Sequence, residues 1–206
     1  MRRIGITTRS CDAQGYNERR DGIARDWYRL LGALDIGFQW LLLPNLGADT
    51  ISYAQCHGVN ALILTGGDDV GTYSARDVTE HALLAYATQH QWPVLGVCRG
   101  MQFMHTFAGG QLVSLGEEHT ACRHEVTISA PLPWASTVSC LEVNSFHRWG
   151  IKSPAAGLQS LAWHADTCEA FVHNTLPWVG IMWHPEREIT LSPMDRALFY
   201  WLFEVE

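Results

Sequence analysis

The chain has 206 residues, of which 47% are hydrophobic and 17% are charged, a composition that excludes a disordered protein. Its formal net charge of −7 argues against a general nucleic-acid-binding protein, which needs a basic surface to contact phosphates. No segment approaches the ~20 apolar residues of a membrane span, and the N-terminus lacks the apolar run of a signal peptide. We therefore expect one domain, spanning residues 1–206, located in the cytoplasm. The six cysteines lack CxxC spacing and are expected to be free thiols, and the nine tryptophans leave room for a homodimer interface.

Strand and helix patterns alternate through the first two-thirds of the chain. Short apolar runs predict strands, and apolar residues at helical spacing predict helices between them. The expected strands are Arg3–Thr7, Trp40–Leu43, Asn60–Leu64 and Pro93–Val97, and the expected helices are Asp21–Leu34, Asp49–His57, Asp77–Gln91 and Met101–Ala108. This alternation predicts an α/β protein of the flavodoxin-like type, a three-layer sandwich in which helices cover both faces of a mostly parallel central sheet.

The pattern changes after Gly110, where short β-like segments punctuated by prolines replace the alternation. The expected strands here are Glu125–Ser129, Thr137–Val143, Leu158–Trp163, Glu169–His173 and Trp178–Met182, followed by a helix at Pro193–Phe203. Strands that follow one another without helices between them favour antiparallel pairing. We therefore expect antiparallel strands added to one edge of the sheet in the C-terminal third.

The most specific motif is Gly96-Val97-Cys98-Arg99-Gly100, which lies between an expected strand and an expected helix. This is the pattern of a nucleophile elbow with cysteine in place of serine, in which flanking glycines permit a tight turn. The turn would expose the sulfur of Cys98 at the carboxyl end of the sheet, and the positive end of the following helix favours its thiolate. The alternative is a buried structural cysteine with glycines beside it by coincidence.

A cysteine nucleophile requires a base and donors for an oxyanion. Among ten histidines, His184 directly follows an expected strand, and Glu186 stands two residues later where its carboxylate can orient the imidazole. The backbone N–H of Arg99 is one candidate oxyanion donor. A second is expected in the glycine-rich turn Thr65-Gly66-Gly67, which follows the strand Asn60–Leu64.

Four segments together resemble class I glutamine amidotransferases, and more closely the stand-alone γ-glutamyl hydrolases of the peptidase C26 type, such as γ-glutamyl-γ-aminobutyrate hydrolases. They are GVCRGMQ (96–102), ILTGGDD (63–69), VNSFH (143–147) and WHPE (183–186). The resemblance implies a catalytic triad of Cys98, His184 and Glu186, with Gly67 and Arg99 as oxyanion donors. It also implies that Gln102 holds the glutamyl group, and that a turn at Asn144, Ser145, Phe146 and His147 lies near the α-amino and α-carboxylate groups of the substrate.

The N-terminal segment from Tyr16 to Trp27 resembles instead the γ-glutamyl-CDP-amidate hydrolases of capsule phosphoramidate biosynthesis, a nearby branch. Arg19 and Arg20, beside an expected helix start, could bind a diphosphate there. The alternative is a solvated, charged helix end. The leaving group of the γ-glutamyl amide therefore stays open between an amine and a phosphoramidate.

Two other functions are compatible with parts of the sequence. One is a glutaminase subunit that delivers ammonia to a separate synthase, and the other is a non-catalytic binding protein with a reactive cysteine, a class that typically lacks the His-Pro-Glu element. We expect a small soluble substrate and no cofactor or metal. His119, Cys122 and His124 could ligate zinc, but their spacing is irregular and the sequence offers no fourth partner.

Overall fold

The computed structural model describes residues 2–34, 39–135 and 138–204. The strands are β1 (Arg3–Thr7), β2 (Arg9–Asp12), β3 (Arg19–Gly22), β4 (Gln39–Leu43), β5 (Ala61–Leu64), β6 (Val94–Val97), β7 (Val113–Ser114), β8 (Thr120–Ile128), β9 (Cys140–Phe146), β10 (Trp149–Gly150), β11 (Leu158–His164), β12 (Thr167–His173) and β13 (Trp178–Ile181). The α-helices are α1 (Asp26–Leu34), α2 (Thr50–Cys56), α3 (Ser74–His90), α4 (Arg99–Phe107) and α5 (Pro193–Phe203), and short 3-10 turns are η1 (Gly47–Asp49), η2 (Glu117–His119) and η3 (Pro185–Arg187).

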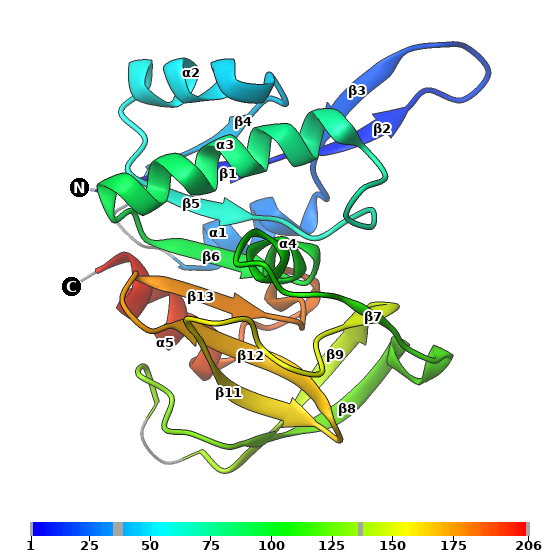
Figure 1. Cartoon of the computed structure of the whole chain (residues 1–206), viewed down its shortest axis with the longest axis vertical. Helices are drawn as coiled ribbons and strands as arrows, with labels where there is room; N and C mark the ends of the chain where they lie inside the picture. The colour runs from blue at the N-terminus through cyan, green and yellow to red at the C-terminus, as the bar shows by residue number, and fades with distance from the viewer. Residues whose placement is uncertain (1, 35–38, 136–137, 205–206) are drawn as a thin grey trace.

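A nine-stranded sheet runs through the molecule in the order β4-β1-β5-β6-β13-β12-β11-β8-β9 (Figure 1). The first five strands pair in parallel, and β12, β11, β8 and β9 extend the sheet with antiparallel pairing. Strand β13 lies between the two halves, parallel to β6 on one side and antiparallel to β12 on the other. Two short ribbons, β2-β3 and β7-β10, lie outside this sheet.

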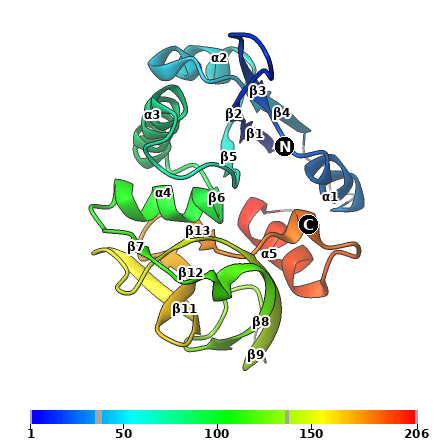
Figure 2. The ribbon, with the colours of Figure 1, turned by 90° about the vertical axis from the view of Figure 1, so that its right-hand side faces the viewer.

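Helices pack on both faces of the parallel half (Figure 2). One apolar cluster joins α1 and α5 to one face, where Trp27 and Phe199 meet strand residues such as Ile6 and Ile63. The second cluster joins α2, α3 and α4 to the opposite face, where Leu83 meets Leu62. Because both faces are buried, the strands β5, β6 and β13 consist of fully buried residues, as parallel strands between helices require. The predicted α/β sandwich with an antiparallel extension is confirmed.

Most expected elements agree with the structure to within a few residues. Strand Arg3–Thr7 and helix Pro193–Phe203 have the expected bounds. The last helix begins where the sequence favours it, because the Ser192 hydroxyl accepts a hydrogen bond from Asp195 N (3.0 Å) and Pro193 occupies the first turn. Within the described residues, no helix is long and apolar enough to cross a membrane.

The expectation of a helix start beside Arg19 and Arg20 is wrong. Helix α1 begins at Asp26, and both arginines lie on β3, the second strand of an exposed hairpin with β2. The helical spacing of apolar residues in this region belongs to α1 alone. The backbone groups of residues 19–22 are instead hydrogen-bonded to β2. A pattern of apolar residues does not reveal such a pairing.

The expected turn at Asn144–His147 is also corrected. The predicted strand Thr137–Val143 begins outside the described residues, and the observed strand β9 runs from Cys140 to Phe146. Asn144, Ser145 and Phe146 therefore lie on a strand that pairs with β8, and only His147 follows it. The register of an antiparallel pair depends on its partner strand, so the boundary cannot be set from β9 alone.

Candidate active site

Cys98 occupies a sharp turn at the end of β6, immediately before α4. Its backbone has φ 50° and ψ −103°, a conformation that costs energy for any residue with a side chain and that typically marks a functional site. The neighbouring strand holds this turn, because Cys98 N donates to Ile181 O at 2.8 Å. A side chain at Gly100 would overlap Leu64 O, so this position accommodates only glycine. The turn predicted from the GxCxG motif is present.

His184 follows β13, the strand next to β6, and the side chains of His184 and Glu186 are only 2% and 3% exposed. Nδ1 of His184 lies 2.6 Å from Oε1 of Glu186. Cys98 and His184 both border Gly66, since a Cβ atom added at Gly66 would lie 2.7 Å from His184 Cε1 and 3.6 Å from Cys98 Cβ. The structure therefore brings the three predicted catalytic residues together.

The electrostatics of His184 favour its protonated form. Burial by itself would lower the pKa of His184, but its interactions with Cys98 and with the carboxylate of Glu186 together raise this pKa to about 9. An imidazolium beside a thiolate is the starting state that cysteine hydrolases use, because the base already holds the proton that the leaving group needs.

The predicted oxyanion donors, the N–H groups of Gly67 and Arg99, belong to two neighbouring turns. Arg99 is the first residue of α4, where backbone N–H groups have no partner within the helix. Gly67 has φ 138°, a conformation that favours glycine. Both turns follow parallel strands at the same edge of the sheet, the place where ligands bind in open α/β folds.

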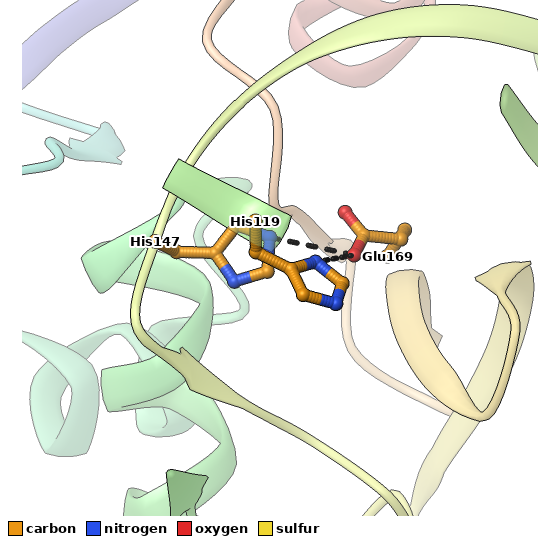
Figure 3. Close-up of side chains that lie close together, drawn as sticks. All are labelled: His119, His147 and Glu169. Carbon is orange, nitrogen blue, oxygen red and sulfur yellow. Dashed lines mark ion pairs between the residues drawn. The ribbon is translucent and has the colours of Figure 1, made fainter. Parts of the chain in front are cut away.

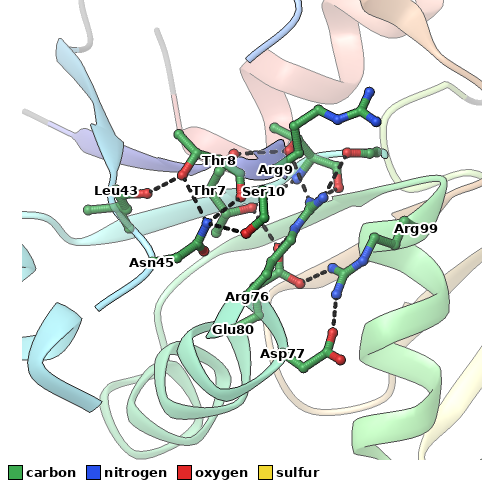
Figure 4. A network of polar contacts seen from close by, with 12 residues as sticks. Thr7, Thr8, Arg9, Ser10, Leu43, Asn45, Arg76, Asp77, Glu80 and Arg99 are labelled. Carbon is green, nitrogen blue, oxygen red and sulfur yellow. Dashed lines mark hydrogen bonds and ion pairs between the residues drawn. The ribbon is translucent and has the colours of Figure 1, made fainter. Parts of the chain in front are cut away.

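A buried ionic network, which no sequence motif indicated, fixes these two turns (Figure 4). Glu80 on α3 is fully buried and lies between two arginines, with Oε1 accepting from Arg76 Nε (2.9 Å) and Oε2 paired with Arg99. Arg76 donates to Thr65 O at 2.6 Å and to Gly66 O at 3.2 Å. The side chain of Arg99 thus links the elbow to the Glu80 carboxylate. The side chain of Arg76 links the glycine turn to the same carboxylate. A salt-bridge pattern at i and i+4 on helix α3 was the only available sequence signal.

Asn144 and Ser145 use their side chains to hold backbone. Asn144 accepts from His184 N and donates to His184 O, both at 2.8 Å, so it fixes the backbone of the candidate base from both sides. Ser145 Oγ donates to His119 O at 2.7 Å. Gln102 is buried on α4 and donates from Nε2 to Trp149 O at 2.9 Å.

Phe146 stands beside the candidate base. Its ring packs edge-on against His184, with 5.7 Å between ring centroids, and the guanidinium of Arg187 lies 4.1 Å above it. His147 is buried and points away toward Glu169, with 3.4 Å between Nε2 and Oε1. Of the four residues of the expected turn, Phe146 is the most exposed.

Arg19 and Arg20 do not line the hollows next to His184. Arg20 pairs with Glu18 and Tyr16 within its own hairpin. The arginines that line a small cavity beside His184 and Glu186 are Arg9 and Arg187. Arg187 also lines a surface hollow of about 370 Å³ that contains Phe146. Neither of these arginines was singled out from the sequence, where they belong to no motif.

Comparison with known proteins decides the family. The model of the peptidase C26 family matches residues 4–186. The chain belongs to the peptidase C26 family. It is 34% identical to the γ-glutamyl-CDP-amidate hydrolase of Campylobacter jejuni over 92% of each chain. It is 26% identical to a glutamine-hydrolyzing GMP synthase subunit of Thermoplasma acidophilum, over 76% of this chain and 81% of that protein.

Solved structures agree with this peptidase C26 assignment at the level of the fold. The glutaminase domain of Trypanosoma brucei CTPS, determined with bound acivicin, has a TM-score of 0.71 and 14% identity, over 98% of this chain and 92% of that one. A glutamine amidotransferase from Thermotoga maritima has a TM-score of 0.66 and 14% identity over 98% of each chain. As a member of the peptidase C26 family, the protein is a hydrolase, and cysteine dependence fits that family.

Proposed function

We propose that this peptidase C26 member hydrolyses the γ-glutamyl amide bond of a small conjugate and releases L-glutamate through a cysteinyl thioester. The observation that carries the proposal is the position of Cys98 in a strained elbow beside His184, whose Nδ1 is held 2.6 Å from Glu186. Such a nucleophile–base–carboxylate arrangement performs acyl transfer on several unrelated folds.

In the first step, the Cys98 thiolate attacks the γ-carbonyl carbon and a C–S bond forms. The resulting oxyanion accepts hydrogen bonds from the backbone N–H groups of Gly67 and Arg99. The C–N bond then breaks while His184 gives its proton to the departing nitrogen. Glu186 keeps the imidazole oriented and stabilises its positive charge until this transfer.

In the second step, the now neutral His184 takes a proton from water, and the hydroxide oxygen attacks the thioester carbon. The tetrahedral intermediate forms in the same oxyanion site, the C–S bond breaks, and glutamate leaves with the thiolate restored. Gln102 and Phe146 are proposed to contact the glutamyl group, while Asn144 and Ser145 act as positioning residues, because their side chains hold backbone. His147, the next residue in the chain, is buried, and its ring faces Glu169.

We further propose that the leaving group is a phosphoramidate, as in γ-glutamyl-CDP-amidate of capsule phosphoramidate biosynthesis, rather than γ-aminobutyrate. The support is twofold. The chain is 34% identical to a γ-glutamyl-CDP-amidate hydrolase over 92% of its length, and Arg9 and Arg187 border the catalytic residues where an anionic group would need cations. Arg19 and Arg20, on the exposed hairpin, are proposed as a second contact for a long nucleotide.

The test is glutamate release from γ-glutamyl-CDP-amidate, γ-glutamyl-γ-aminobutyrate and glutamine, with Cys98→Ala beside the wild type. We expect one conjugate to be cleaved much faster than glutamine, and Cys98→Ala to reduce this rate by about 10⁴-fold or more, as loss of a nucleophile does in comparable triads. The matched control is Cys140→Ser, which removes an exposed thiol and should keep full activity. Failure to cleave either conjugate would contradict the proposal.

A glutaminase subunit is the second candidate, favoured by the similarity to a glutamine-hydrolyzing GMP synthase subunit. It predicts that glutamine is the best of the three substrates and that a separate synthase increases the rate of its hydrolysis. The same substrate panel separates the two functions, because a free-standing hydrolase needs no second protein.

A further inference from the structure

A cluster of buried histidines, none of them part of the candidate triad, surrounds one buried carboxylate in the antiparallel half. Glu169 on β12 is 1% exposed, and the ring nitrogens of three histidines approach its oxygens. Oε1 lies 3.4 Å from His147 Nε2 and 3.8 Å from His119 Nδ1, and Oε2 lies 3.6 Å from His124 Nε2 (Figure 3 shows His119, His147 and Glu169). These groups come from three parts of the chain: the continuous segment η2–β8, the residue after β9, and β12.

The cluster is incomplete as a hydrogen-bonded network. Within the described part of the chain, neither oxygen of Glu169 makes a hydrogen bond, and neither do His119 Nδ1, His147 Nε2 and both ring nitrogens of His124. In proteins the great majority of buried polar atoms are hydrogen-bonded, so a group of unpaired ones that converge on one point calls for a partner, which a bound cation would supply. The shortest separation, 3.4 Å, exceeds the usual hydrogen-bond length of about 2.7–3.2 Å.

The tautomer of His147 points to the same conclusion. Its Nδ1 lies 3.1 Å from Trp149 O, and a carbonyl only accepts, so Nδ1 carries a proton. In the neutral ring, Nε2 then presents a lone pair to a carboxylate oxygen, which is repulsive unless a proton or a metal cation lies between them. A histidine that donates one ring N–H to a backbone carbonyl and directs its other nitrogen to a common point is the usual arrangement of a metal ligand.

We propose that the protein binds a divalent transition-metal ion, of which Zn²⁺ fits best, through His119, His147 and Glu169, with His124 as the fourth ligand. The three principal ligand atoms all lie within 4.8 Å of one another. In a tetrahedral zinc site with bonds of about 2.0–2.2 Å, ligand atoms are about 3.4 Å apart, so the three ligands, and His124 with them, would draw together around the ion. A set of three imidazoles and a carboxylate favours zinc over magnesium or calcium, which prefer oxygen.

The surroundings of the cluster support a preformed site. The His164 ring stacks on that of His124, with centroids 4.0 Å apart at an angle of 9°, and its Nδ1 donates to Glu125 O at 2.8 Å. Cys122 does not take part, because its thiol donates to Glu118 O.

The bound ion would join β8, β9 and β12 and thereby hold the segment next to the candidate base. His147 follows Asn144 by three residues, and Asn144 holds the backbone of His184. Glu169 O accepts from Met182 N at 2.8 Å, two residues before His184. The role is structural, since the site is buried and none of its residues belongs to the candidate triad.

The test uses the full chain in a Cys98→Ala background, which removes the catalytic thiol as a competing ligand. The protein is stripped with EDTA and titrated with Zn²⁺ against a chromophoric chelator, and a parallel sample receives Co²⁺. We expect one metal ion per chain, the strong visible absorption of four-coordinate Co²⁺, and a melting temperature that rises with Zn²⁺ concentration. Glu169→Gln should weaken binding by about 100-fold or more, whereas His90→Ala, which changes an exposed histidine, should leave it unchanged.

Substoichiometric zinc, a pale six-coordinate Co²⁺ spectrum or a melting temperature independent of Zn²⁺ would overturn the proposal and leave a cluster held by protons alone. If Glu169→Gln does not fold, the spectrum of the Co²⁺-loaded parent and anomalous scattering from its crystals still decide the question. Because every readout is metal binding or stability, the result is independent of the proposed hydrolysis.

Discussion

Two buried carboxylates, Glu80 in the parallel half and Glu169 in the antiparallel half, have opposite surroundings. Glu80 is fully paired, since it accepts from Thr7 Oγ1 (2.8 Å) and Arg76 Nε (2.9 Å) and pairs with Arg99. Among the residues that the structure describes, the ionic partners of the Glu169 carboxylate are three imidazoles at 3.4–3.8 Å. Arginine is charged at every relevant pH, whereas histidine changes charge near neutrality.

The difference separates two uses of a buried charge. A network closed by guanidinium groups has no open position, so it can only hold its surroundings in place, and Glu80 holds the elbow and the glycine turn. A carboxylate among unpaired imidazoles has donor atoms to spare, so it can take up a cation. Burial of a charged side chain thus predicts a ligand only where its hydrogen bonds are incomplete.

The largest effect on stability is expected for Glu80→Gln. The amide nitrogen of glutamine would face a buried arginine, and two guanidinium groups would lose their counter-charge. Breaking a buried ion pair from one side costs about 3–5 kcal/mol in the free energy of unfolding. Urea denaturation measures this cost, with the exposed Glu117→Gln as a control that should change stability little. A cost below about 1 kcal/mol would show that the network does not fix the fold.

Glu169→Gln should differ from Glu80→Gln in its dependence on metal. With EDTA present, we expect a modest loss of stability, because the carboxylate has only long contacts to lose. With saturating Zn²⁺ the wild type gains stability and the variant does not, which at 100 times the dissociation constant is about 2.7 kcal/mol. Melting temperatures of both variants with and without Zn²⁺ measure the difference. An equal response of the two variants to zinc would contradict the contrast between the carboxylates.

The pH dependence tests the third ionic group, His184 with Cys98 and Glu186. The pKa of His184 is raised from 6.5 to about 9 in the folded protein. Protonated His184 therefore stabilises the fold fully below about pH 6.5, and this stabilisation is lost as the pH rises through about 9. Activity should follow, since imidazolium protonates the leaving nitrogen, and kcat/KM should fall about tenfold per pH unit above 9. In Cys98→Ala, the stability loss should move to lower pH. An alkaline limb near pH 7 in the wild type would exclude a stable ion pair.

The smallest effect is expected for Arg187→Ala. If Arg187 contacts an anionic leaving group at an open site, its loss should raise KM for γ-glutamyl-CDP-amidate about tenfold and leave hydrolysis of uncharged conjugates nearly unchanged. The same measurement on Arg20→Ala, in the hairpin, compares Arg187, which the structure places near the site, with an arginine that was predicted from the sequence. Equal effects on charged and uncharged substrates would assign Arg187 to the packing of Phe146 alone.

The candidate triad was predictable because its signals are local. Cys98 lies two residues from each of the glycines that its turn requires. His184 and Glu186 are separated by one residue, after an apolar strand. Turn, nucleophile and base therefore appear in short stretches of sequence whose geometry is fixed by their own backbone.

The parts that escaped prediction depend on distant partners. The hairpin that carries Arg19 and Arg20 exists because residues 9–12 pair with 19–22, and the extent of β9 depends on its register with β8. The histidine cluster joins residues 119, 124, 147 and 169, a span of the chain in which no spacing suggests a metal site. Glu169 was expected only as the first residue of a strand, so the sequence offered no fourth partner.

The position of strand β13 determines how the protein unfolds. It is paired on both sides, with β6 and with β12, and is completely buried, so its amide protons can exchange with solvent only when the whole sheet opens. The candidate base, His184, lies three residues after the end of this strand. Heating should therefore leave no partly melted species that has lost the geometry of His184 but kept the rest of the fold, and inactivation should coincide with cooperative unfolding.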